Sequence, residues 1–192
     1  MTNANKKVAV FCGSKAGLNP VYMEKAFELG AFFQTQNWDL VYGGASIGIM
    51  GKIADSVISH GQKAIGVMPE NLGNLEITHK NLSELFVVSD MHSRKKMMYD
   101  LADGFIIFPG GMGTLDEMFE ILTWAQLKIH HKPCYLLNIN SFYDAQLAHL
   151  ARIYEEGFMS KEHFELLRPV NCIEDLGSMF HSMLENSAGL SL

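Results

Sequence analysis

The chain has 192 residues, of which 48% are hydrophobic and 19% charged, and its formal net charge is −6. This balance indicates no basic surface for nucleic acid, and no apolar run reaches the roughly 18 residues that a membrane helix needs. We therefore expect a single globular domain over residues 1–192, with a core at about residues 7–185 and a frayed tail at 187–192.

Cysteine and histidine usage indicates no metal site. Cys12, Cys134 and Cys172 are odd in number and far apart, so they predict neither a disulfide framework nor structural zinc. The eight histidines show no ligand spacing, and we interpret His130 and His131 as a solvated pair after a helix. Residues 1–7 lack the apolar stretch of a secretion signal. Together these features predict a cytoplasmic protein.

Apolar runs rich in β-forming residues alternate with segments of helix length. In chain order, the pattern predicts a strand at 8–12, a helix from Pro20 to about 35, a strand at 40–42, a helix at 47–60 capped by Ser46, a strand at 64–68, a strand at 85–88, a helix at 91–101 capped by Asp90, a strand at 105–108, a helix at 115–127, a strand at 134–138, and helices at 142–156 and 173–184.

Strands separated by helices of this length predict an α/β fold, with a parallel sheet covered by helices on both faces. In such sheets ligands bind beyond the carboxyl ends of the strands. Glycine-rich turns follow three of the predicted strands, so all three turns should face the same edge of the sheet. These turns contain Gly13 and Ser14, Gly43 and Gly44, and Gly110, Gly111 and Gly113.

The first two turns do not indicate a dinucleotide cofactor. The segment after the first strand, Gly-Ser-Lys-Ala-Gly, is not Gly-x-Gly-x-x-Gly, and no acidic residue ends the second strand. The turn at Gly13 fits either a tight β–α connection or a ligand contact. Gly43 and Gly44 fit a turn that approaches a ligand, whereas we interpret Gly48 and Gly51 as close packing of a helix on the sheet.

The third turn carries the strongest signal. Residues 109–117 read Pro-Gly-Gly-Met-Gly-Thr-Leu-Asp-Glu, where a buried strand runs into a helix. One interpretation is a capping box, in which Thr114 caps the helix and Glu117 bonds back to it. Capping needs none of the three glycines, however. The alternative is that a phosphate rests on the free amides of the helix start, with the acid Glu117 one turn further on.

A basic run, Arg94-Lys95-Lys96, begins the helix after Asp90. Such a run is usually a solvated face. Cations near a helix N-terminus oppose the helix dipole, so we expect at least one of them to meet an anion. Arg94 is the best candidate because guanidinium binds phosphate or carboxylate with two bonds. Together with Lys95, it could also offset the repulsion that Asp116 and Glu117 exert on a phosphate, which would make the two helix starts halves of one site.

These motifs together resemble the LONELY GUY family of cytokinin riboside 5′-monophosphate phosphoribohydrolases, long labelled "possible lysine decarboxylases". The resemblance extends over roughly residues 7–185. It rests on Phe-Cys-Gly-Ser at 11–14, Tyr-Gly-Gly at 42–44, Met-His-x-Arg-Lys at 91–95 and the signature at 109–117. The chain departs from the family pattern at Ala45, where a third glycine is frequent, and at Ser93, where Glu or Gln is common.

The resemblance implies a Rossmann-like three-layer domain, usually a homodimer, that cleaves a nucleoside 5′-monophosphate to a free base and ribose 5-phosphate. It implies Arg94 and Glu117 as the catalytic pair, and no cofactor. In dimeric members the site includes residues of the partner subunit. The implied substrate-binding residues are Gly13, Ser14, Gly44, Glu76, Lys95, Gly110, Gly111, Met112, Gly113, Thr114, Leu115, Asp116 and Thr123.

Three functions remain open from the sequence. The first is hydrolysis of N6-substituted adenosine monophosphates, with AMP as a further candidate substrate. The second is a non-catalytic nucleotide-binding carrier or sensor, which the glycine turns would serve equally well. A dinucleotide oxidoreductase is disfavoured by the missing acidic residue. The decarboxylase label lacks support because a pyridoxal phosphate enzyme needs a Schiff-base lysine and a larger scaffold.

Overall fold

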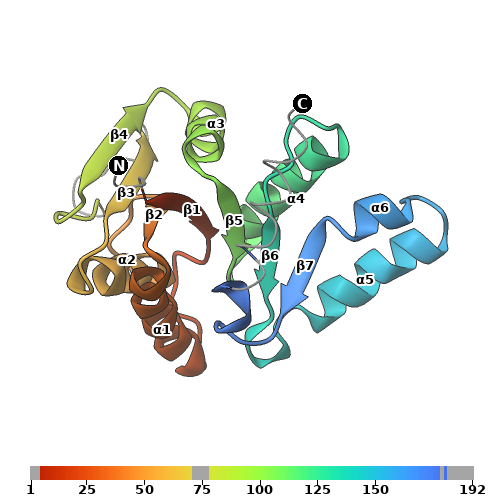
Figure 1. The fold of residues 1–192 in the computed structure, drawn as a ribbon, viewed down its shortest axis with the longest axis horizontal. Coiled ribbons are helices and arrows are strands. Elements are labelled where there is room, and N and C mark those ends of the chain that lie inside the picture. Colours follow the sequence, from red (N-terminus) through yellow and green to blue (C-terminus); the bar gives the residue numbers. More distant parts are fainter. Residues whose placement is uncertain (1–4, 71–77, 178–179, 181–192) are drawn as a thin grey trace.

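The computed structural model describes residues 5–70, 78–177 and 180, which contain a seven-stranded sheet (Figure 1). All the strand pairs are parallel, and the strand order is β4-β3-β2-β1-β5-β6-β7. The α/β class predicted from the sequence is confirmed. The strands are β1 (Lys6–Phe11), β2 (Trp38–Tyr42), β3 (Ala64–Pro69), β4 (Glu84–Val88), β5 (Gly104–Ile107), β6 (Cys134–Leu137) and β7 (Leu167–Val170).

Helices cover both faces of this sheet (Figure 1). α1 and α2 pack with Ile173, Leu176 and Phe180 on one face, and α3, α4 and α5 pack on the other. The helical elements are α1 (Val21–Gln36), α2 (Gly48–Ser59), α3 (Met91–Leu101), α4 (Met112–Gln126), the 3-10 turn η2 (Ile139–Ser141), α5 (Asp144–Glu155) and α6 (Lys161–Phe164). Among the described residues, no helix combines the length and the apolar character needed to cross a bilayer.

The order of the strands in the sheet determines where a ligand crevice can form. From β1 the chain winds outward to β4, then returns to β5 on the other side of β1. Val8 of β1 therefore has a partner on each side, Leu40 in β2 and Gly104 in β5. The loops that leave β1 and β5 run to opposite faces, and the crevice between them is where open α/β sheets bind ligands.

Two expectations about α2 are wrong. Its N-cap is Ile47, with no side-chain cap, so Ser46 does not take that role. Gly48 begins the helix with a φ of 60°, and a Cβ there would overlap the carbonyl of Ser14. The glycine thus lets α2 approach the turn after β1, rather than the sheet. A Cβ at Gly51 would likewise meet the backbone of Ser46.

Three features of the second half of the chain also differ from expectation. His130 is buried, its ring bonded to the Ile121 carbonyl at 2.9 Å, so it is not part of a solvated pair. Trp124 and the Met and Phe residues of the helix predicted at 115–127 are expected in the core from their apolar character; Met118 is buried, but Phe119 is exposed and Trp124 only partly buried. The strand β7 and the helix α6 were not predicted. Much of the predicted helix at 173–184, and the tail at 187–192, lie outside the described residues.

Candidate active site at the carboxyl edge of the sheet

The glycine turns after β1 and β5 touch at the carboxyl edge of the sheet. The Gly13 amide donates a hydrogen bond to the Pro109 carbonyl at 3.1 Å. A Cβ built on Gly13 would lie 3.3 Å from the Gly110 Cα, so the two backbones are nearly in van der Waals contact. This contact confirms that turns distant in the sequence share one edge.

Beside these turns lies a hollow of about 220 Å³, which we call the Arg94 hollow. Residues from β1, from the turns after β1, β2 and β5, and from α2, α3 and α4 surround it. It is lined by Val10, Cys12, Gly13, Ser14, Gly43, Met50, Arg94, Met98, Gly111, Met112, Gly113, Thr114 and Glu117.

The α4 helix begins three residues earlier than predicted, and this removes the capping-box interpretation. Gly111 is the N-cap, no side chain caps the helix, and the first intrahelical bond joins the Leu115 amide to the Gly111 carbonyl at 3.1 Å. Thr114 is thus the third helical residue and lies buried. The amides of residues 112–114 precede this first bond, so they remain available to an anion.

The three glycines of this turn have different reasons to be glycine. A Cβ at Gly110 would overlap the Thr114 hydroxyl and lie 2.8 Å from the Gly13 amide nitrogen, so the protein's own packing requires it. A Cβ at Gly111 or Gly113 would meet nothing within 4 Å. At these two positions the backbone is bare toward open space, as an approaching ligand would need.

Glu117 and Arg94 both line the Arg94 hollow and contact each other. Arg94 Nη1 donates to Glu117 Oε1 at 3.1 Å, and Arg94 Nε donates to the Val67 carbonyl at 3.1 Å. The two side chains are only 13% and 9% exposed. The N-terminal parts of α3 and α4 therefore lie side by side, with Arg94 and Glu117 in contact. That they are halves of one site stays a prediction.

Burial dominates the ionisation of Glu117. Desolvation, together with the charge of Asp116, raises the pKa of its carboxyl to about 7, although Arg94 and Lys95 act in the opposite direction. A carboxyl that changes charge near neutral pH, inside a concave site, is typical of catalytic groups.

Lys95 lies beside this pair but serves a different contact. Its ammonium is 3.1 Å from both Asp116 and Glu120, and its side chain is 11% exposed. Lys95 thus ties α3 to α4 outside the Arg94 hollow. It also neutralises the Asp116 carboxylate, which would otherwise repel an anion at the start of α4.

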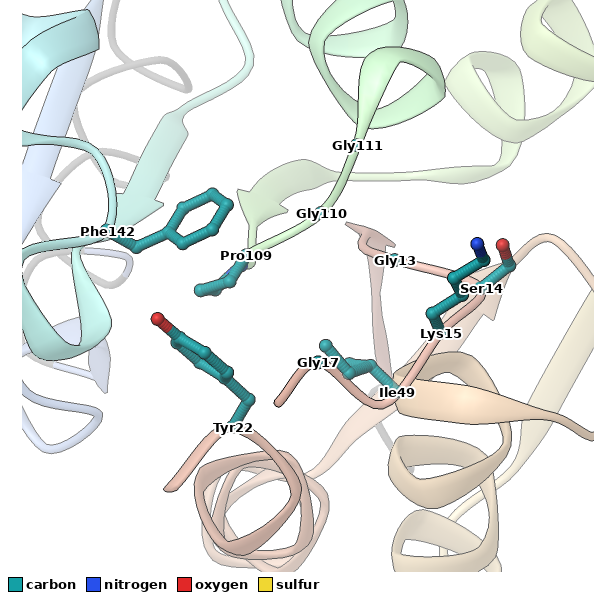
Figure 2. Close-up of a pocket in the computed structure, with 10 residues that line it drawn as sticks. All are labelled: Gly13, Ser14, Lys15, Gly17, Tyr22, Ile49, Pro109, Gly110, Gly111 and Phe142. Atoms are coloured by element: carbon teal, nitrogen blue, oxygen red, sulfur yellow. The ribbon is translucent and has the colours of Figure 1, made fainter. Parts of the chain in front are cut away.

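A second cavity of about 360 Å³ adjoins the Arg94 hollow, and we call it the aromatic pocket. Figure 2 shows Tyr22 and Phe142 on one side of it, with Ile49 and Lys15 across from them. The two rings meet edge to face, with centroids 5.8 Å apart. Gly13, Ser14 and Gly111 line both spaces. The larger cavity is mainly apolar, while the paired charges line the smaller one.

Several predicted site residues lie away from the Arg94 hollow. Gly44 turns toward Met68, and its neighbour Gly43 lines the hollow in its place. Leu115 is half-buried, and Asp116 points outward to Lys95. Thr123 is exposed, with its hydroxyl bonded to the Phe119 carbonyl at 2.7 Å. Glu76 falls outside the described residues.

Sequence reasoning also missed lining residues. Met50 and Met98 line the Arg94 hollow, as do Val10 and Cys12 from β1 and its end. Met98 follows Arg94 by four residues on α3, so helical spacing could have indicated that both share a face. Within the described part of the chain, no cluster of three or more His, Cys, Asp or Glu side chains could hold a metal ion.

Comparison with known proteins gives consistent relatives. The family described as "Possible lysine decarboxylase" matches residues 50–179. A cytokinin riboside 5′-monophosphate phosphoribohydrolase of Arabidopsis thaliana is 48% identical over 155 residues, covering 81% of this chain and 73% of that protein. A second such enzyme of the same plant is 45% identical over 155 residues, covering 81% of this chain and 71% of that protein.

Among solved structures, similarity extends over nearly the whole chain. The molybdenum cofactor binding protein of Rippkaea orientalis has a TM-score of 0.72 at 19% identity, covering 95% of this chain and 99% of that chain. A Moco carrier protein of Chlamydomonas reinhardtii has a TM-score of 0.70 at 18% identity, with coverage of 95% and 99%. At these identities the likeness shows a shared fold alone.

Proposed function

Because this chain belongs to the LONELY GUY family, whose members also carry the description "possible lysine decarboxylase", we propose that it hydrolyses the N-glycosidic bond of nucleoside 5′-monophosphates. The products are a free base and ribose 5-phosphate. The substrates are N6-substituted adenosine monophosphates and AMP itself. The observation that carries this proposal is the buried Arg94–Glu117 pair, facing a hollow whose wall is the open start of α4.

The 5′-phosphate rests on the first amides of α4 in this proposal. These N–H groups and the helix dipole favour an anion. The bare backbone at Gly111 and Gly113 lets phosphate oxygens come close. Because Glu117 follows Gly113 by about one helical turn, a ribose extending from the phosphate brings its anomeric carbon toward the carboxylate.

Glu117 then acts on the sugar. Cleavage of the bond from C1′ to the base nitrogen passes through an oxocarbenium-like state with positive charge on the ribose. The bonding electron pair leaves with the base, water adds to C1′, and the base gains a proton overall. The ionised carboxylate of Glu117 stabilises the developing charge or orients the water. Arg94 holds this carboxylate in place and, as a permanent cation, does not serve as the proton donor.

A lysine-dependent decarboxylation fits the site poorly. Burial lowers the pKa of Lys95, but the hydrogen bonds and charges of Asp116 and Glu120 outweigh this effect and raise its pKa above the ordinary value. A Schiff base requires a neutral amine, so an ammonium held by two carboxylates is unsuited to form one.

A non-catalytic carrier is the rival proposal. The amides of α4 would serve a carrier as well as an enzyme. A buried acid with a pKa near neutrality beside an anion site weakens binding, however, so a carrier gains nothing from Glu117. Glu117 therefore favours hydrolysis over transport.

Incubation with AMP and with isopentenyl-AMP tests the proposal. We expect chromatography to detect free base and ribose 5-phosphate in equal amounts. Glu117→Gln should retain AMP binding and lose roughly 10²–10³-fold in kcat, as electrostatic groups of this kind do. Glu120→Gln, on the same helix outside the hollow, is the matched control and should keep most of the activity. Binding of AMP without any cleavage by the wild type would favour the carrier.

We also propose that the protein is a homodimer that buries the outer face of α4. Met112 is 82% and Phe119 39% exposed, and helical spacing puts them on one face with Thr123. In a dimer, this face could bring Thr123 near the partner's nucleotide. A monomeric mass by light scattering at micromolar concentration would contradict this proposal.

A further inference from the structure

The guanidinium of Arg94 is held by three separate elements. Its Nε donates to the carbonyl of Val67 in β3, and its Nη1 donates to Glu117 in α4, each at 3.1 Å. The third nitrogen, Nη2, lies directly over Gly43 at the end of β2, where a Cβ atom would overlap it. The guanidinium thus occupies space that any other residue at position 43 would fill.

We propose that Gly43 is a positioning residue for the hydrolysis. Because Gly43 has no side chain, it leaves the space, here called the seat, in which the Arg94 guanidinium lies beside Glu117. This inference rests on the proposed function, because it concerns the same reaction. It assigns the glycine a partner within the protein, whereas the sequence alone indicated the approach of a ligand.

Backbone conformation does not account for this glycine. Gly44 has a φ of 79°, whereas Gly43 has no positive φ. The nearest atoms to a Cβ at position 43 are Arg94 Nη2, Met50 Sδ at 3.1 Å and Arg94 Cζ at 3.3 Å. All belong to the outer parts of long side chains, which can move. At Gly48, by contrast, a Cβ would meet the backbone of Ser14.

An alanine at position 43 should therefore displace Arg94 while leaving the fold intact. Displacement by about 1 Å in a catalytic constellation can cost roughly 100-fold in rate. It should also weaken the influence of the guanidinium on Glu117. Since Arg94 lowers the pKa of that carboxyl, its removal from the seat should raise the pKa further.

The test is a double-mutant cycle of Gly43→Ala, Arg94→Ala and the double variant, assayed with AMP. We expect Gly43→Ala alone to lower kcat about 100-fold, with a much smaller change in KM. In the Arg94→Ala background the added methyl group should change kcat by less than about twofold. If the two losses multiply instead, Gly43 acts independently of Arg94 and the proposal is overturned.

The thermal stability of the same three variants provides a second test. If Gly43→Ala alone fails to fold because it collides with Arg94, the double variant should recover the Tm of Arg94→Ala. If the double variant also fails to fold, the collision involves Met50 or the backbone and not Arg94, and the proposal is overturned.

A titration separates this inference from the proposed function. Carbon-13 NMR of labelled glutamate, with the Glu117 signal assigned by Glu117→Gln, measures the pKa of this carboxyl without any turnover. Gly43→Ala should raise that pKa relative to the wild type. An unchanged pKa of Glu117 would overturn the proposal for Gly43. A wild type that binds AMP without cleaving it would overturn only the proposed hydrolytic activity.

Discussion

Arg94 and Glu117, 23 residues apart in the sequence, meet at 3.1 Å between the N-terminal parts of two helices. The ion pair lies largely out of solvent, where charges are costly unless they are paired. Burial nevertheless dominates at Glu117, whose pKa remains raised to about 7. The Glu117 carboxylate is thus held in surroundings that only partly compensate its charge, and two consequences can be measured.

The rate should depend on pH through Glu117. If the ionised carboxylate stabilises the charged ribose, kcat/KM for AMP should rise with pH through about 7 and level off above it. Initial rates between pH 5 and pH 9 test this expectation. The substrate phosphate also ionises, at about pH 6, so the pH dependence of binding is measured separately with a slowly cleaved analogue. A rate that instead falls as pH rises through 7 would assign activity to the protonated acid.

The free energy of unfolding should show the opposite pH dependence and fall as the pH rises through 7. The pKa of Glu117 is raised from 4.5 to about 7 on folding, so the folded state resists ionisation. Below pH 4.5 this group costs nothing; as pH rises through 7 the cost reaches its full value, about 3 kcal/mol. Glu117→Gln should therefore gain stability over the wild type at pH 8 and gain little at pH 4.5. Urea unfolding at the two pH values measures the difference, and an equal effect at both would contradict it.

Lys95 should matter more to stability than to chemistry. Lys95→Met keeps the aliphatic stem but removes the ammonium that joins Asp116 and Glu120, and we expect a loss of about 1 kcal/mol. Lys96→Met is the matched control, since it removes an exposed pair with Asp100 and a contact of the ammonium with the Tyr99 ring, and should cost less. Thermal unfolding compares them. A Lys95→Met variant as inactive as Glu117→Gln would instead make Lys95 part of the catalytic machinery.

The sequence predicted the sheet and the edge at which the glycine turns after β1 and β5 meet, because buried parallel strands and glycine turns are local signals. Asp90 also caps α3 as expected, accepting from the Ser93 amide at 2.8 Å. The strand β7 escaped notice because it is short and contains Arg168 and Pro169, residues that suit an edge strand.

The errors at the site come from patterns with more than one local solution. A Thr three residues before Glu fits a capping box, and the observed start of α4 at Met112, with Gly111 as its N-cap, decides against it. Glu117 instead contacts Arg94 on another helix. Two consecutive glycines, Gly43 and Gly44, cannot be ranked without knowing which one faces the Arg94 hollow. Such choices depend on distant segments, which no local pattern contains.

The bare backbone at Gly111 and Gly113 offers a starting point for altering substrate range. A methyl group at either position would meet no protein atom, so the fold itself imposes no steric penalty there. Small libraries at these two codons, selected on synthetic nucleotides with bulky or modified phosphates, could change the shape of the start of α4 where the phosphate is proposed to bind, while the rest of the fold remains unchanged.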